Sequence, residues 1–540
     1  MVNILEKTVV VIVLLLIISS SGYTNDVNVL DFGAKGDSLT NNTEYIQRSI
    51  DECAKTGGGK VIIPPGYYLT GTILLRSNIT LHLQAGSVLS ASTNLKDYPV
   101  HRYYEQARKQ IHSYKCLIYA DSLDGIAITG NGTIKGNGFH SSFNSRKESG
   151  GHSMDNRPFI IFFRNCKNVV IRDLHFKNSA SWMLRYENCD FVNISGITVF
   201  NHCNRNNDGL DIVSCSNVAV TNCFFDTDDD AIVIKSFSRL SKNITISNCI
   251  ISSHAEAIKC GTESNIGFKN IAISNCVVRP SVVKSNFNGI GGGMGRGGLS
   301  LVMYDGGTME NIRFSNIVMD SVRTPIIITL AKRGTPVWSQ EPKQPGIGII
   351  RNIHFNGITA TNVGNKSCLI NGLPGHDVTQ ISFRDMHFIF GNNIVNDTLP
   401  SEFPINYSYY PLLRKYNTPS FAFYLRNVSH IQFDGIYLSY PSSEQRPAII
   451  VDEGKEIHIN SLQVQMDKIL CAPLVKLIQT KKVSITGVKG LQNINTFLEV
   501  NGNQSEEIIM RNNTFTDVKE IFINSDDVKP STILMSDELR

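Results

Sequence analysis

One recurring phrase constrains the fold of this 540-residue chain more than any other feature. The phrase is an Asn, a β-branched residue, any residue and then an apolar residue, and it begins at positions 168, 193, 217, 243 and 270. These starts are 25, 24, 26 and 27 residues apart, and two more follow at 311 and 352, at intervals of 41. A period in the mid-twenties with β-branched strands and polar turns is typical of stacked parallel strands. We therefore predict an all-β fold, a single parallel β-helix (solenoid), with about three strands per coil and about 4.8 Å between coils.

Other repetitive folds fit the phrase less well. A leucine-rich repeat has a similar period, but it requires a leucine scaffold and helical segments that the sequence lacks. A sandwich or barrel requires hairpin turns rather than one recurring phrase. We expect the Asn of each phrase to form an internal ladder at a turn, which is a structural role. We also expect Cys223, Cys249 and Cys276 to stack as small buried side chains.

The two ends of the chain carry their own signals. Lys7 precedes an apolar run at 8–18 and the small residues that follow it, which matches a signal peptide at 1–22. This run is shorter than the roughly 20 residues that span a bilayer. Residues 43–55 have helical periodicity and are expected to form a short helix that caps the solenoid. We place the β-helix domain at 23–523 and a C-terminal tail at 524–540. The expected location is secreted (extracellular or periplasmic), without stable membrane association after signal removal.

Acidic residues concentrate at one place in the repeat. Six aspartates lie between positions 208 and 230, among short strand-like segments. Asp208 and Asp229 are 21 residues apart, close to one coil, so their carboxylates can meet on neighbouring coils. Close carboxylates raise one another's pKa, and a protonated carboxyl beside an ionised one is what a glycosidase uses. Asp and Asn are also common in turns between strands, so the cluster alone leaves both interpretations open.

Three features make the sequence resemble glycoside hydrolase family 28, the polygalacturonases and their pectin-degrading relatives. They are the phrase VLDFGAKGD at 29–37, the triplet at 206–208 in place of the family's Asn-Thr-Asp, and the Asp229-Asp230 pair. The resemblance covers roughly residues 27–365. It implies a right-handed parallel β-helix and hydrolysis with inversion, for which carboxyls roughly 6.5–9.5 Å apart are required. It further implies that Asp229 is the general acid, that Asp208 and Asp230 activate water, and that Asn206 binds substrate.

Two family motifs depart from this pattern. Anchoring the Gly-His-Gly turn on the Gly-Thr pair at 261–262 puts Glu256 where the family has His, with His254 two residues earlier. The Arg-Ile-Lys motif, which in polygalacturonases grips the sugar carboxylate, falls at 298–302, where no basic residue stands. Lys259, Lys235, Arg205 and Arg296 are candidates to replace the missing charge. We therefore expect Glu256, His254, Lys259 and Lys235 to bind substrate, although Lys235 also fits a solvated outer face and His254 a turn.

These observations predict a secreted glycoside hydrolase that acts on a pectic polysaccharide. The missing cations favour rhamnogalacturonan or a substituted pectin over plain polygalacturonate, because each charge-assisted contact contributes about 1.5–3 kcal/mol. A polysaccharide lyase that holds Ca²⁺ on the aspartates and a non-catalytic carbohydrate-binding solenoid remain alternatives. The net charge of +4 argues neither for nor against nucleic acid, but the motifs point elsewhere. We expect a monomer with no nucleic-acid partner, no cofactor and no metal.

Overall fold

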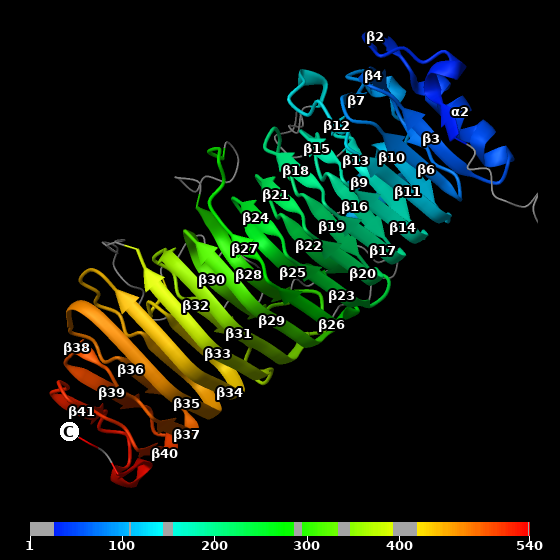
Figure 1. The fold of residues 1–540 in the computed structure, drawn as a ribbon. Helices are drawn as coiled ribbons and strands as arrows, with labels where there is room; N and C mark the ends of the chain where they lie inside the picture. Colours follow the sequence, from blue (N-terminus) through cyan, green and yellow to red (C-terminus); the bar gives the residue numbers. More distant parts are fainter. Residues whose placement is uncertain are drawn as a thin grey trace, which may run out of the picture.

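The computed structural model describes residues 26–106, 110–143, 155–285, 294–332, 346–391, 418–537 and 539. Its strands stack in parallel into one elongated solenoid, with the N-terminal helix at one end and the C-terminus at the other (Figure 1). Among the described residues, no helix is long and apolar enough to cross a membrane. The predicted all-β parallel solenoid is confirmed.

Three ladders of parallel strands form the walls of the solenoid, and successive strands of each ladder stack on one another. The first, which carries the candidate site, comprises β5 (Ile73–Leu74), β10 (Cys116–Asp121), β13 (Phe159–Arg164), β16 (Leu184–Glu187), β19 (Leu210–Val213), β22 (Ile232–Ser236), β25 (Glu256–Ser264), β28 (Gly295–Met303), β30 (Val322–Leu330) and β32 (Cys368–Asn371). The second comprises β1 (Asp26–Asn28), β3 (Gly59–Ile63), β6 (Ile79–Leu83), β11 (Asp124–Gly130), β14 (Lys167–Arg172), β17 (Asp190–Ser195), β20 (Ser216–Thr221), β23 (Ser241–Ser247) and β26 (Gly267–Ser274). The third comprises β2 (Asp37–Asn41), β4 (Gly66–Thr70), β7 (Ser87–Ala91), β12 (Thr133–Lys135), β15 (His175–Lys177), β18 (Thr198–Asn201), β21 (Phe224–Thr227), β24 (Ile250–Ser253) and β27 (Val277–Val278).

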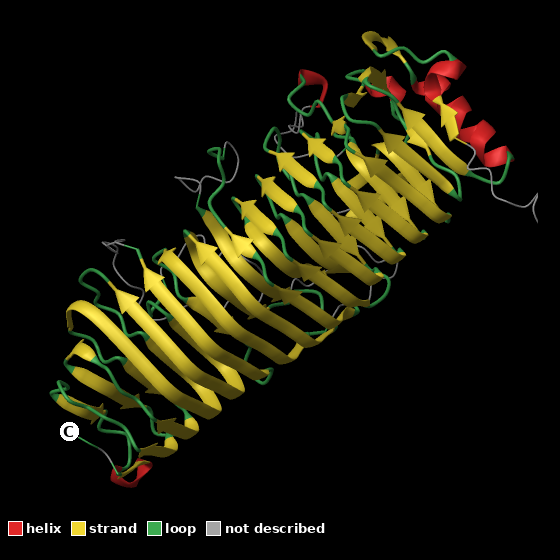
Figure 2. Ribbon diagram, in the orientation of Figure 1, coloured by secondary structure: helices red, strands yellow, loops and turns green. Residues whose placement is uncertain are grey.

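Later coils replace separate strands by long ones that run across a corner (Figure 2). Because β29 pairs with both β26 and β27, it continues the second and third ladders at once. These long strands are β29 (Thr308–Asp320), β31 (Ile349–Val363), β33 (Val378–Phe390), β34 (Phe423–Tyr440) and β35 (Ile449–Leu470). The last coils contain β36 (Val475–Ile478), β37 (Lys481–Thr486), β38 (Gln492–Ile494), β39 (Thr496–Asn501), β40 (Glu506–Arg511), β41 (Glu520–Asn524) and β42 (Ile533–Ser536). One antiparallel pair, β8 (Arg102–Gln106) with β9 (Gln110–Tyr114), lies outside the solenoid sheet.

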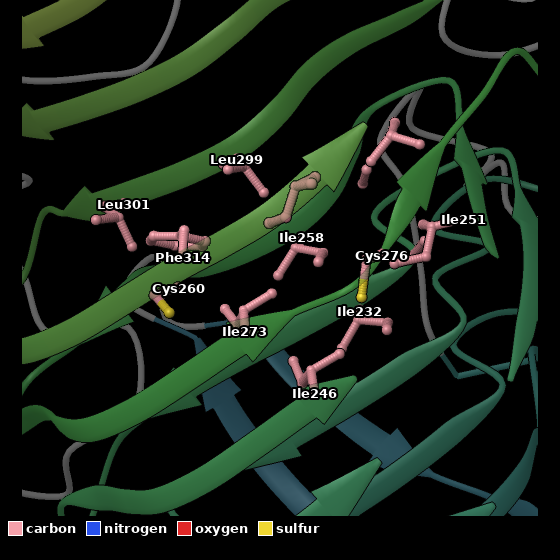
Figure 3. Packing of buried hydrophobic residues seen from close by; sticks show 14 of the residues in the cluster. Ile232, Ile246, Ile251, Ile258, Cys260, Ile273, Cys276, Leu299, Leu301 and Phe314 are labelled. Carbon is pink, nitrogen blue, oxygen red and sulfur yellow. The ribbon is translucent and has the colours of Figure 1, made fainter. Parts of the chain in front are cut away.

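In the second ladder, the core follows from the alternation of buried and exposed residues along a strand. In β23, Ile244 and Ile246 are buried while Asn243 and Thr245 between and beside them are exposed. The parallel register repeats this pattern from coil to coil, so that Ile244 stacks on Ile271. Burial of each such side chain is worth about 1.5–3 kcal/mol. Figure 3 shows this packing, with the aliphatic side chains labelled there meeting in the interior.

A ladder of asparagines forms at one bend, as predicted. Asn243 donates to Asn217 Oδ1 over 3.0 Å, and Asn270 donates to Asn243 Oδ1 over 3.1 Å. Each has a positive φ near 55°, which Asn tolerates better than most residues. Two details of the prediction were wrong. The ladder lies on the exposed side of the bend rather than inside it, and Asn193 is not part of it, because Asn193 pairs with Ala219 and leaves Phe191 at the ladder position.

The predicted capping helix is confirmed as α2 (Thr43–Lys55). Its buried side chains, Ile46, Ile50 and Cys53, join the core and close the end of the first coil. Short 3-10 helices lie at η1 (Val29–Phe32), η2 (Leu95–Asp97), η3 (Ser141–Phe143) and η5 (Pro530–Thr532). At the other end, the boundary at 523 needs correction. The predicted tail contains β42, which pairs in parallel with β40 and therefore extends the solenoid.

The predicted cysteine ladder also forms. Cys223, Cys249 and Cys276 are buried and free, and they follow one another at the same point of successive coils. Small thiols fill the narrow corner between two ladders of strands, which is the behaviour expected of a buried free cysteine.

Candidate active site

Two neighbouring coils bring the three predicted catalytic aspartates together. Asp208 stands two residues before β19, and Asp230 stands two residues before β22. Because Leu210 of β19 pairs with Ile232 of β22, the two aspartates occupy the same position in adjacent coils. The turns are joined by Gly209 N–H, which donates to the Asp230 carbonyl over 3.0 Å.

The same register adds a third acid to this column. Ile232 pairs with Ile258 of β25, so Glu256 lies directly above Asp230. Asp208, Asp230 and Glu256 therefore form an acidic column along three successive coils. Asp229 is the neighbour of Asp230 in the turn between β21 and β22, and its Oδ1 accepts the Asp230 N–H.

Asp230 is the acid that the protein holds in its ionised form. Lys259 Nζ lies 2.7 Å from Asp230 Oδ2, and both side chains are buried. Burial raises the pKa of Asp230, but the charges of Lys259 and Arg296 outweigh burial and hold this pKa below its ordinary value. A charge-assisted contact of this length favours the carboxylate.

The surroundings of Asp229 instead favour the protonated form of its carboxyl. Burial, followed by the charge of Asp230, raises the pKa of Asp229 to about 6. Within the described residues Asp229 makes no ion pair, and its Oδ1 accepts only the Asp230 N–H, over 3.0 Å. Its backbone carbonyl is fixed by the hydroxyls of Thr227 and Ser253, which donate over 2.6 and 2.7 Å. The turn thus positions a carboxyl that retains a proton more readily than its neighbour does.

Asp208 departs from the expected role of an ionised base. Burial, and then the charges of Asp211 and Asp229, raise its pKa well above the ordinary value. The nearest cation, Lys235 Nζ, lies 3.8 Å from Asp208 Oδ2 and is closer to Asp211, whose Oδ1 is 2.5 Å away. The three aspartates are therefore not all ionised at once, and Asp230 is the one most favoured to carry the negative charge.

Lys235 is a buried member of the site rather than part of a solvated face. It is 7% exposed, and its ammonium group lies 4.6 Å from the centre of the Trp182 ring. Burial lowers the pKa of Lys235, but the carboxylates of Asp211 and Asp208 outweigh this and raise it. Its charge is therefore used to hold the acids of the site together.

Glu256 is enclosed by its own partners. Arg296 Nε donates to its Oε1 over 2.7 Å, and the Ser300 hydroxyl donates to its Oε2 over 2.7 Å. A Cβ at Gly297 would lie 1.8 Å from Glu256 Oε2, so any larger residue there would have to displace the Glu256 carboxylate from its partners. Ser300, which stands where a basic residue was expected, thus supports a buried acid. Glu256 is fully buried, and its predicted contact with substrate is not supported.

Asn206 is held at the rim of the site by a residue that the motifs did not indicate. Its side-chain oxygen accepts from Arg157 Nη2 over 3.2 Å, and Arg157 Nη1 donates to the Arg205 carbonyl over 2.5 Å. Arg157 is 1% exposed, and burial lowers its pKa to about 10 despite the attraction of Asp208. Because Arg157 is only one of several charged residues in its segment, nothing in the sequence marks it as a partner of the aspartates.

His254 does not join the acidic column. It is fully buried, and its Nε2 lies 2.9 Å from the Val283 carbonyl oxygen. Its ring packs 5.5 Å from that of His202, centre to centre. The prediction that His254 binds substrate is therefore not supported by its position. A separate surface depression of about 1110 Å³, lined in part by Lys60, His82 and Arg172, lies on the second ladder of strands, away from the aspartates.

Comparisons with known proteins identify one family of enzymes. The model of glycosyl hydrolases family 28 matches residues 53–398. A probable polygalacturonase from Vitis vinifera is 29% identical over 377 residues, covering 65% of this chain and 72% of the relative. An exo-poly-alpha-D-galacturonosidase from Dickeya chrysanthemi is 28% identical over 38% of this chain and 41% of its own length.

Solved structures show the same fold. A hyperthermoactive exopolygalacturonase from Thermotoga maritima superimposes with a TM-score of 0.57 at 24% identity, over 76% of this chain and 92% of that structure. At this identity the likeness concerns the fold alone. It confirms the predicted right-handed parallel β-helix.

Proposed function

The chain belongs to family 28 of the glycosyl hydrolases, and on that premise we propose that it is a secreted enzyme that hydrolyses a pectic polysaccharide. Glycoside hydrolase activity follows from the family. The observation that carries the proposal is the contrast between two adjacent carboxyls, since Asp230 is paired with Lys259 and Asp229 has no ion-pair partner among the described residues. A glycosidase requires one carboxyl that donates a proton and another that stays ionised.

In the proposed mechanism, Asp229 protonates the oxygen of the leaving sugar. The carboxylate of Asp230, with Asp208 on the coil below, orients a water molecule and accepts its proton as the water attacks the anomeric carbon. The glycosidic bond breaks as the new carbon–oxygen bond forms on the opposite face of the sugar, which inverts the configuration. Lys259 keeps its charge throughout and prevents Asp230 from taking the proton that Asp229 must hold.

Three of the cations around the acids are held by carboxylates, which supports a substrate without a carboxylate at the central subsite. Lys235 is bound to Asp211, Lys259 to Asp230, and Arg296 to Glu256. Binding a galacturonate carboxylate through any of them would require breaking a buried ion pair, at a cost of about 3–5 kcal/mol. A neutral sugar such as rhamnose could bind without breaking any of these ion pairs. We therefore propose rhamnogalacturonan or a substituted pectin, rather than plain polygalacturonate, as the preferred substrate.

A panel of pectic polymers and oligomers tests this proposal. The purified enzyme is incubated with rhamnogalacturonan oligomers and with de-esterified polygalacturonate, and the new reducing ends and the anomers first formed are recorded by NMR. We expect faster release from rhamnogalacturonan, with inverted products. Faster cleavage of polygalacturonate would overturn the specificity, and retained configuration would overturn the mechanism. An unsaturated, ultraviolet-absorbing product would instead identify a lyase, and absence of any cleavage a binding solenoid.

A further inference from the structure

Three successive coils place His202, Asp228 and His254 at the same position. Asn201 of β18 pairs with Thr227 of β21, and Thr227 pairs with Ser253 of β24. The next residues along the chain are His202, Asp228 and His254, which are therefore stacked at the bend that follows these strands. Their spacing of 26 residues in each interval is the repeat itself.

The three side chains converge on one point. Each residue contributes one possible ligand atom, which is a ring nitrogen for each histidine and a carboxylate oxygen for Asp228. These three atoms lie within 4.8 Å of one another. The Nδ1 atom of His202 is 3.9 Å from Asp228 Oδ1. All three residues are buried, and the Nδ1 atoms of both histidines are buried without a hydrogen-bond partner.

The outer nitrogens fix the orientation of both rings. His254 Nε2 lies 2.9 Å from the Val283 carbonyl, which can only accept, so this nitrogen carries the proton. His202 Nε2 lies 2.9 Å from Asp226 Oδ1, and a carboxylate likewise accepts. In the neutral imidazole the proton sits on one nitrogen alone, so each Nδ1 presents its lone pair to the centre. Histidines that ligate metals are usually held in this way, through the nitrogen that does not bind the metal.

We propose that His202, Asp228 and His254 bind a first-row transition-metal cation of the zinc class. Imidazole nitrogen with one carboxylate oxygen is a donor set that suits zinc, whereas calcium and magnesium prefer oxygen alone. Zinc bonds of about 2.0–2.2 Å require the donor atoms to close in by a modest side-chain movement. Three protein ligands leave a fourth position for water.

The site would fix the turn that carries the catalytic acids. Asp228 immediately precedes Asp229, so a metal on Asp228 ties this turn to the bends of the coils below and above. Its role would be to position the turn, because none of its three ligands is one of the proposed catalytic acids. This proposal differs from the expectation from sequence that no metal is bound, and it stands independently of the proposed glycosidase activity.

Metal content and thermal stability test the site directly. The full chain is stripped with a chelator, incubated with Zn²⁺ and passed through a desalting column, and zinc per chain is measured by mass spectrometry. The thermal midpoint is recorded before and after zinc addition. The test variants are His254→Gln and the double variant His202→Ala/His254→Ala. The matched control is His175→Ala, at a histidine on the outer surface of β15 whose ring contacts Asn131.

We expect about one zinc per chain in the parent and the control, and a thermal midpoint that rises with zinc, since a ligand bound only by the folded state stabilises it. The double variant should retain less than about a tenth of this zinc and show no shift. Co²⁺ in the parent should give the visible absorption bands of a four-coordinate site, a readout that remains if the double variant does not fold. The proposal would be overturned if the parent showed no stoichiometric zinc, no rise of the thermal midpoint with zinc and no cobalt bands. It would also be overturned if the His254→Gln variant bound zinc as the parent does.

Discussion

Lys259 Nζ lies 2.7 Å from Asp230 Oδ2, and this buried contact makes two adjacent aspartates chemically different. Asp229 and Asp230 are neighbours in one turn, where Asp230 is buried and Asp229 is half-buried. Without a cation on one of them, neither would have a defined protonation state, because the charges of close carboxyls are coupled. The ion pair assigns the negative charge to Asp230 and leaves the proton to Asp229.

Replacing Lys259 should therefore reduce catalysis more than binding. In Lys259→Met the apolar stem is kept and the charge is lost, so Asp230 competes with Asp229 for the proton. We expect kcat to fall about 10²-fold or more, with a smaller change in KM. Loss of one partner of a buried pair also destabilises by about 3–5 kcal/mol, so rates are measured well below the thermal midpoint. Lys242→Met, at an exposed position of β23, is the control, and equal kcat in both variants would refute the role of Lys259.

Gly297 should tolerate no side chain. In Gly297→Ala the added Cβ would lie 1.8 Å from Glu256 Oε2, which forces Glu256 away from Arg296 and Ser300. We expect destabilisation by about 1–3 kcal/mol, measured by chemical denaturation. Gly346→Ala is the matched control, because a Cβ there meets nothing within 4 Å. An unchanged stability of Gly297→Ala would show that Glu256 can move freely.

Glu444 should contribute a pH-dependent part of the stability. Burial raises its pKa, but its hydrogen bonds to Arg446 and the charge of Arg446 outweigh burial and lower it. Arg446 Nε and Nη2 donate to Glu444 over 2.9 and 2.7 Å, and its Nη1 donates to carbonyls of three other residues. Since the pKa is lower in the folded state, the stabilisation is present above the unfolded value, about 4.3, and is lost as pH falls through the folded one.

The variant Glu444→Gln isolates this contribution. Its stability relative to the parent is measured by denaturant unfolding between neutral and acidic pH. We expect the difference in the free energy of unfolding between parent and variant to be largest near neutral pH and to become smaller below about pH 4. A gap that stays constant across this range would show that the ionisation of Glu444 does not contribute. Glu499→Gln, at a half-buried acid paired with Lys476, serves as the comparison.

The features of the fold that arise from periodic patterns in the sequence could be predicted. The parallel solenoid and the Asn and Cys ladders follow from residue types that recur once per coil, and the α2 cap follows from the helical periodicity of residues 43–55. The spacing of 21 residues predicted that the carboxylates of Asp208 and Asp229 meet on neighbouring coils. The strand register instead stacks Asp208 on Asp230, which is the next residue along the chain from Asp229. The misplacement of Asn193 shows the limit of this reasoning, since a coil two residues out of phase with the motif can only be recognised from the pairing of β17 with β20.

Contacts that depend on side-chain direction could not be predicted. Glu256 and His254 are two residues apart, yet Glu256 joins the acidic column and His254 faces His202. The ion pair between Arg296 and Glu256 depends on the absence of a side chain at Gly297. No sequence motif indicates this requirement. Arg157 reaches the site from a distant segment, so sequence spacing gives no indication of its contact with Asn206.

The Asp229→Asn variant tests the central claim most directly. The amide keeps the shape of the side chain and removes the proton donor, so folding should be preserved while hydrolysis fails. On the best pectic substrate of the panel, we predict a fall in the initial rate of reducing-end release of about 10²–10⁴-fold, with an unchanged thermal midpoint. A variant that folds as the parent does and retains near-parental turnover would contradict the assignment of Asp229 as the general acid.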